Sequence, residues 1–290
     1  MTVATAPVFG ARAIRRRRRT TETAVRTLLG LAALLAAGLL LVILGYVVVR
    51  GLPALTPAFF TQRPLPFGVE GGGVAPAIIG TVVLGAIAAV IAVPVGIAAA
   101  VFAVEYRAGR FAAVVRFSAE LIAGLPSIVV GVFVWAFLVR TVIGHYAGLA
   151  GGVALAVIMI PIVARTVEEV LRLVPASLRE AAMALGAPRW RVILRIVIPS
   201  ARAGITTAVI LAVARAAGET APLLLTALGN VYFSGDLLQP MAALPLQIYQ
   251  YAVSPYEDWH TKAWGSSLIL VSVVAAMSGL LRFALRGRVR

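Results

Sequence analysis

Long apolar runs separated by short polar stretches dominate the chain, and six of them are candidates for membrane-crossing helices. At a rise of about 1.5 Å per residue, roughly 20 apolar residues cross the hydrocarbon core of a bilayer. The second run is about 31 residues long, so we expect it to tilt or to bend near Pro94. The pattern predicts an all-α integral membrane protein with six transmembrane helices. The runs cover residues 28–49, 74–104, 121–139, 149–164, 203–228 and 263–283.

The positive charge between the runs predicts which way the helices face. The chain has 26 arginine and lysine residues. Twenty of them belong to the two termini and to the polar segments after the second and fourth runs, whereas four lie on the opposite side. Cytoplasmic segments of membrane proteins carry such an excess. Both termini are therefore predicted to lie in the cytoplasm.

The same pattern predicts how the chain is organised. We expect a basic cytoplasmic tail at 1–27, a first transmembrane helix with its outer loop at 28–73 and a transmembrane domain at 74–285. A short basic cytoplasmic C-terminus at 286–290 follows. A polar cytoplasmic segment, the coupling loop at 174–200, lies within the transmembrane domain.

Composition excludes several classes of protein. The chain is 61% hydrophobic and 13% charged, which is typical of an integral membrane protein rather than a soluble core. A formal net charge of +15 could indicate nucleic-acid binding, but the basic residues interrupt the apolar runs at intervals instead of forming one patch. No nucleic-acid partner is therefore expected. With no cysteine, disulfides and thiolate metal sites are excluded.

The coupling loop contains the most informative segment, EAAMALGAPRWRVILRIVIP at 180–199. The alanines after Glu180 favour a short helix, Gly186 ends it, and Pro188 can begin a second helix. A bent helix pair on the cytoplasmic side predicts a docking site for another protein. The second helix is expected to share one apolar face among Trp190, Ile193, Leu194 and Val197.

This loop resembles that of the membrane subunits of ABC importers, whose pattern is Glu-Ala-Ala, three residues, Gly, nine residues and then Ile-x-Leu-Pro. The chain departs from the pattern only by an isoleucine in place of the leucine. The resemblance implies the type I ABC importer (MetI-like) permease fold and a loop that binds a separate ATPase subunit. The matching residues are Glu180, Ala181, Ala182, Gly186 and Pro199.

The energy source is expected to lie outside this chain. A Walker A loop needs Gly-Lys-Ser/Thr, whereas the sole lysine, Lys262, precedes Ala263. We therefore expect no cofactor on this chain, with ATP and magnesium bound by the partner ATPase. An intramembrane enzyme would need paired carboxylates, a histidine or a metal site in the spans, and only Glu219 and glutamates at the membrane interface are present.

Two arginines near or within the spans are candidate pathway residues. Arg215 lies about twelve residues, or roughly 18 Å, into the fifth run, and Glu219 is expected on the same helical face. Because a charge at that depth needs a partner or a cavity, a packing ion pair and an anion site are equal alternatives. Arg165, nearer the cytoplasm, is expected to pair locally with Glu168 and Glu169, with a role at the inner mouth of a pathway as the alternative.

A second resemblance concerns the transported solute. The segment ARAAGETAPLLLTALGN at 214–230, the glycines at 71–73, GLPSIV at 124–129 and RTVEE at 165–169 resemble PstA-type subunits of phosphate importers. The resemblance implies that Arg215, Glu219 and Arg165 take part in phosphate movement. It also implies a heterodimer with a PstC-type permease, a PstB-type ATPase dimer, a PstS-type phosphate-binding protein and a place in the bacterial inner membrane. Sulfate or molybdate remains an alternative substrate, whereas an ion-coupled secondary transporter would not explain the coupling loop.

Overall fold

The structure is a computed structural model that describes residues 9–66, 68–69, 71–106 and 109–286. The chain divides into two compact units, Met1–Val49 and Arg50–Arg290. One long helix, α1 (Phe9–Gly51), makes up the described part of the first unit. Its leucines between residues 28 and 41 are exposed, as expected of a helix that contacts lipid. Residues 1–8 of the predicted N-terminal tail and 287–290 of the predicted C-terminus lie outside the described residues.

The described part of the second unit consists of helices and connecting loops and contains no strand. Two π-helical segments, Trp135–Ile143 and Ile193–Val197, continue α5 and α8, and a 3₁₀ turn spans Leu52–Ala54. The helices are α2 (Pro57–Thr61), α3 (Ala75–Glu105), α4 (Arg110–Gly124), α5 (Ser127–Val134), α6 (Gly148–Arg172), α7 (Ala176–Ala184), α8 (Arg189–Val192), α9 (Ile198–Ala216), α10 (Ala221–Thr226), α11 (Leu244–Ala252) and α12 (Glu257–Arg286).

The core of the second unit lies between α3, α6 and α9. Small residues let these helices approach closely, as is usual where helices pack within a membrane. A methyl group added at Gly152 of α6 would lie 2.4 Å from Ile87 Cγ2 of α3. One added at Gly204 of α9 would lie 2.4 Å from Val170 Cγ1 of α6. Close packing therefore fixes α6 between its two neighbours.

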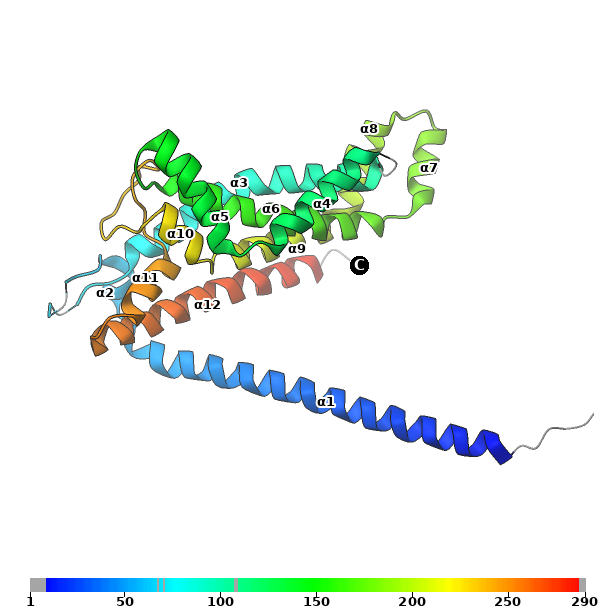
Figure 1. Cartoon of the computed structure of the whole chain (residues 1–290), viewed down its shortest axis with the longest axis horizontal. Helices are drawn as coiled ribbons and strands as arrows, with labels where there is room; N and C mark the ends of the chain where they lie inside the picture. Colours follow the sequence, from blue (N-terminus) through cyan, green and yellow to red (C-terminus); the bar gives the residue numbers. More distant parts are fainter. Residues whose placement is uncertain (1–8, 67, 70, 107–108, 287–290) are drawn as a thin grey trace, which may run out of the picture. The chain divides into compact units, whose positions relative to one another are not determined.

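The two ends of this unit differ in structure. In Figure 1, α7 and α8 lie at one end, and α2 and α11 lie at the other. At the α2 end, a loop caps the start of α6, where Gly148 N donates to Gln239 O (2.9 Å) and Leu149 N donates to Leu237 O (2.8 Å). These bonds satisfy N–H groups that have no partner within the helix. The loop therefore fixes the end of α6 that lies away from the coupling loop.

The structure supports most of the predicted membrane spans. Among the described residues, four helices are long and apolar enough to cross a membrane, and α4 and α5 together would provide a fifth. The sixth predicted run, 263–283, lies within the 30-residue helix α12. Six crossings, cytoplasmic termini and the predicted domain boundaries stay predictions.

The third run, 121–139, was expected to be one span, and the structure shows that it is not one continuous helix. α4 ends at Gly124, α5 begins at Ser127, and the two are bent by 103°. The cause is Pro126, which lacks an N–H group and disfavours a helical conformation for the residue before it. Accordingly, Leu125 is extended, with φ −74° and ψ 137°.

Candidate functional site

The coupling loop forms the predicted pair of helices with a glycine bend. α7 ends in a left-handed turn at Gly186, whose φ is +82°. Gly186 N donates to Met183 O (2.9 Å), and Ala187 N donates to Ala182 O (3.2 Å). Together these bonds are the Schellman arrangement, which closes a helix on a glycine. α8 then begins after Pro188, as the sequence predicted.

Most of the predicted docking residues are accessible. Glu180, Ala181, Gly186 and Pro199 are exposed, whereas Ala182 is buried. The loop also exposes large apolar side chains that the described part of the chain leaves uncovered. Exposed apolar area of this kind is typical of surfaces that contact another protein or a membrane. These side chains are Leu178, Met183, Leu185, Trp190 and Leu194.

The four residues predicted to share one apolar face of the second helix differ in burial. Ile193 and Val197 are buried, but Trp190 and Leu194 are 56% and 57% exposed. The helix continues from α8 into the π-helical segment, where the turns are wider than in an α-helix. Only part of the predicted apolar face is therefore covered by the described part of the chain, and the shared face stays a prediction.

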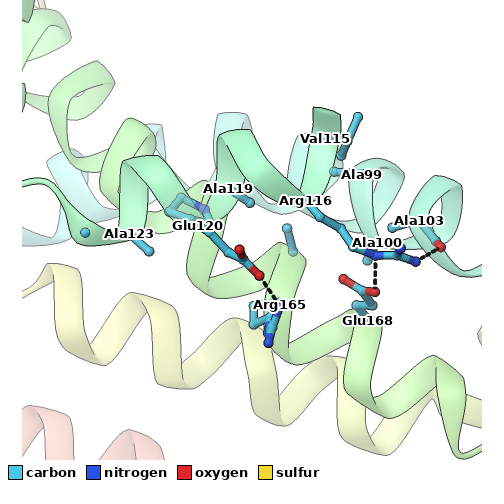
Figure 2. A pocket seen from close by; sticks show the side chains of 13 residues that line it. Ala99, Ala100, Ala103, Val115, Arg116, Ala119, Glu120, Ala123, Arg165 and Glu168 are labelled. Carbon is cyan, nitrogen blue, oxygen red and sulfur yellow. Dashed lines mark hydrogen bonds and ion pairs between the residues drawn. The ribbon is translucent and has the colours of Figure 1, made fainter. Parts of the chain in front are cut away.

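A cavity of about 450 Å³ lies between α3, α4 and α6 (Figure 2). Six of its 13 lining residues are alanines, whose short side chains leave the space open. Four charged residues line it, Arg116 and Glu120 from α4 and Arg165 and Glu168 from α6. The predicted residue Arg165 therefore lies in a charged cavity, whereas Arg215 is not among the lining residues.

Two ion pairs join α4 to α6 across this cavity (Figure 2). Arg116 Nε lies 2.8 Å from Glu168 Oε1, and Glu168 is buried. Arg116 also donates to the carbonyl of Ala103 at the end of α3, and Arg172 donates to Glu168. The buried carboxylate is thus satisfied by two guanidinium groups from different helices, as a charge in a low-dielectric site requires.

The second ion pair partly corrects the expected pairing of Arg165. Arg165 Nη1 lies 2.9 Å from Glu120 Oε1, and Arg165 Nε lies 3.6 Å from Glu169 Oε1. Pairing with Glu169 is confirmed, but Glu168 pairs with Arg116 and Arg172 instead. Glu120 was missed because it precedes the third run directly and gave no local signal. Both Arg165 and Glu120 are exposed, so this pair is open to competition.

Arg215 and Glu219 were expected on one helical face, and this is wrong. α9 ends at Ala216, directly after Arg215, and Glu219 lies in the non-helical segment before α10. Gly218 and Pro222 explain the break, since glycine weakens a helix and proline removes a donor. The fifth run, 203–228, is therefore two helices.

The break leaves Arg215 in the last turn of α9, where the helix dipole favours a cation. Arg215 is exposed and Glu219 is half-buried. Among the described residues, neither has an oppositely charged side chain within 4.0 Å. The chain thus presents an unpaired guanidinium beside an unwound segment, an arrangement suited to binding an anion.

Comparison with known families and proteins gives a consistent result. Residues 92–287 match the family described as binding-protein-dependent transport system inner membrane component. A protein named phosphate transport system permease protein PstA from Xylella fastidiosa strain Temecula1 is 42% identical over 264 residues, which is 91% of this chain and 92% of that protein. The protein of the same name from Pasteurella multocida is 46% identical over 80% of this chain and 83% of its own.

Solved structures give the same fold. An inward-facing structure of the MetNI methionine ABC transporter matches with a TM-score of 0.59 and 23% identity. The match covers 73% of this chain and 92% of that chain. At this level of identity the likeness concerns the fold alone, and it confirms the predicted MetI-like architecture.

Proposed function

The chain belongs to the family of binding-protein-dependent transport system inner membrane components, and from this premise we propose that it is the PstA-type membrane subunit of an ATP-driven phosphate importer. It forms half of the translocation pathway and catalyses no reaction of its own. The observation that carries the proposal is the 42% identity, over 91% of the chain, to a phosphate transport permease.

Arg215 is proposed to bind phosphate within the pathway. A charged side chain in a membrane span has to face protein or water. In the isolated chain Arg215 is exposed. A PstC-type permease that covers this surface would enclose the guanidinium between the two subunits. Guanidinium groups bind tetrahedral oxyanions through paired N–H groups, and Glu219, four residues on, would limit the positive charge there.

Arg165 is proposed to act nearer the cytoplasmic mouth. It lines the cavity between α4 and α6, where its exposed pair with Glu120 can exchange for an anion. Phosphate would pass from Arg215 towards Arg165 as the helices rearrange. The two arginines would serve successive positions, since they do not line one cavity.

The coupling loop is proposed to transmit the work of a PstB-type ATPase dimer, which binds the ATP and magnesium. Exposure of Glu180, Gly186, Leu185 and Trp190 supports docking at this end of the protein. A PstS-type binding protein would deliver phosphate on the opposite side of the bacterial inner membrane. Closure of the ATPase would then switch the pathway between outward and inward openings, with both termini in the cytoplasm.

The proposal is tested by uptake into membrane vesicles that contain this chain and its three kinds of partner. We expect uptake of labelled phosphate only with ATP and the ATPase, and little inhibition by sulfate or molybdate. Preferred uptake of sulfate or molybdate would assign the chain to another oxyanion. Uptake that continues without the ATPase and depends on an ion gradient would refute the proposal of an ATP-driven importer.

Glu120→Gln is predicted to raise the apparent affinity for phosphate. The Glu120–Arg165 pair is 2.9 Å long, with side chains 61% and 56% exposed, and competes with an anion for the guanidinium. Because exposed ion pairs contribute up to about 1 kcal/mol, the half-saturating phosphate concentration should fall roughly twofold to fivefold. Glu169→Gln, which removes the longer 3.6 Å pair, should have the smaller effect. An unchanged or higher concentration in Glu120→Gln would exclude this competition.

A further inference from the structure

A buried carboxylate joins the coupling loop to the end of α3. Glu105 is the last residue of α3 and is 7% exposed. Arg179 of α7 places its Nε 3.0 Å from Glu105 Oε1, and Arg189 of α8 donates to the main-chain carbonyl of Glu105. One residue of α3 therefore receives an arginine from each arm of the bent loop.

Further contacts make this junction rigid. Arg179 Nη1 donates to Val174 O (2.6 Å) and its Nη2 donates to Leu171 O (3.0 Å), so the same side chain caps the C-terminal end of α6. The Arg189 guanidinium lies 4.8 Å from the centre of the Tyr106 ring, a cation–π contact. The Tyr106 ring stacks on Phe102 of α3 with 5.3 Å between ring centres. The two arginines thus contact the C-terminal ends of α3 and α6, two of the three helices that enclose the core.

We propose that Glu105 is the positioning residue through which displacement of the coupling loop reaches α3 and α6. We call Glu105, Arg179 and Arg189 the α3 anchor. Separating Arg179 from Glu105 would leave a buried charge without a partner, which is unfavourable. A displacement of the coupling loop should therefore move α3 with it. This inference rests on the proposed function, because it concerns how a movement driven by an ATPase is transmitted within the chain.

The main test measures phosphate transported per ATP hydrolysed, the coupling ratio. Glu105→Gln keeps the side-chain shape and removes the charge, so we expect normal abundance and ATPase binding with a coupling ratio at least about fivefold lower. Asp258→Asn is the matched control, since it breaks the 2.8 Å Lys262–Asp258 pair outside the anchor. It should leave the ratio unchanged. A wild-type ratio in Glu105→Gln would overturn the proposal.

A second variant tests the proposal if Glu105→Gln does not accumulate in the membrane. Arg189 is exposed, and Arg189→Gln removes its contacts to the Glu105 carbonyl and to Tyr106 without changing the buried pair. The coupling ratio should again fall, and an unchanged ratio would overturn the proposal.

A third measurement separates the anchor from the transported solute. The chain has no cysteine, so Val90→Cys on α3 and Met183→Cys on α7, both at exposed positions, accept spin labels without background. The distance between the labels should be narrowly distributed in the otherwise unchanged chain and broader with Glu105→Gln. If the wild-type complex takes up no phosphate, the proposed function fails, and the distances still decide the anchor. An equally narrow distribution in the variant would refute it.

Discussion

Arg215→Gln is expected to lower phosphate uptake roughly a hundredfold, because it removes the guanidinium without changing the fold. A hydrogen bond to a charged group contributes about 1.5–3 kcal/mol, and one guanidinium group can donate two such bonds to a phosphate. Arg215 is exposed and has no ion-pair partner among the described residues, so the substitution breaks no ion pair there. Initial rates of labelled uptake in vesicles, normalised to the amount of protein, measure the effect.

Two further variants make this result specific. Arg202 is exposed on the same helix, α9, near its start, and Arg202→Gln should retain uptake within about twofold. Arg215→Lys keeps the charge but loses the paired N–H groups, so it should fall between Arg215→Gln and the unchanged protein. Normal uptake by Arg215→Gln at normal abundance would remove Arg215 from the pathway.

Local features of the sequence predicted the coupling loop well. The bend depends on Gly186, which has the positive φ that glycine adopts without strain, and on Pro188, which precedes α8. Both effects act within a few residues, so spacing alone was sufficient. The long apolar helices could be predicted equally well from the sequence, since the bilayer sets their length and composition.

Breaks inside apolar runs were missed because hydropathy does not register them. Pro126 and Pro222 lie within predicted apolar runs, yet α5 begins directly after Pro126 and α10 begins at Ala221, next to Pro222. Proline is tolerated at membrane depth when other groups satisfy the backbone, so its presence alone did not identify a break. The pairing of Arg215 with Glu219 failed for this reason, as it assumed an unbroken helix.

The ion pairs between helices could not be predicted from neighbouring residues in the sequence. Arg179 and Glu105 are 74 residues apart, and Arg165 and Glu120 are 45 apart. Each pair forms because packing brings the end of one helix beside another, and a single sequence does not specify which helices are neighbours. Spacing of three or four residues found only the Arg165–Glu169 contact.

Leu185→Asp is expected to separate the protein from its ATPase. Leu185 directly precedes the Gly186 bend and is 90% exposed, the highest value among the large apolar side chains of the coupling loop. If it fills a pocket of the ATPase, placing a carboxylate there costs about 2 kcal/mol or more, which lowers affinity roughly thirtyfold. Copurification of the ATPase should be lost and ATP-dependent uptake should fall with it, while the amount of protein in the membrane stays the same.

The control for this variant lies at the other end of the second unit. Val253, which follows α11, is 65% exposed, and Val253→Asp introduces the same charge away from the coupling loop. It should leave ATPase binding intact, as should Leu185→Met, which keeps an apolar side chain of similar volume. Because Leu185 is 90% exposed, loss of binding by Leu185→Asp alone would identify direct contact with the ATPase. Equal binding by Leu185→Asp and Val253→Asp would show that this tip of the loop faces no partner.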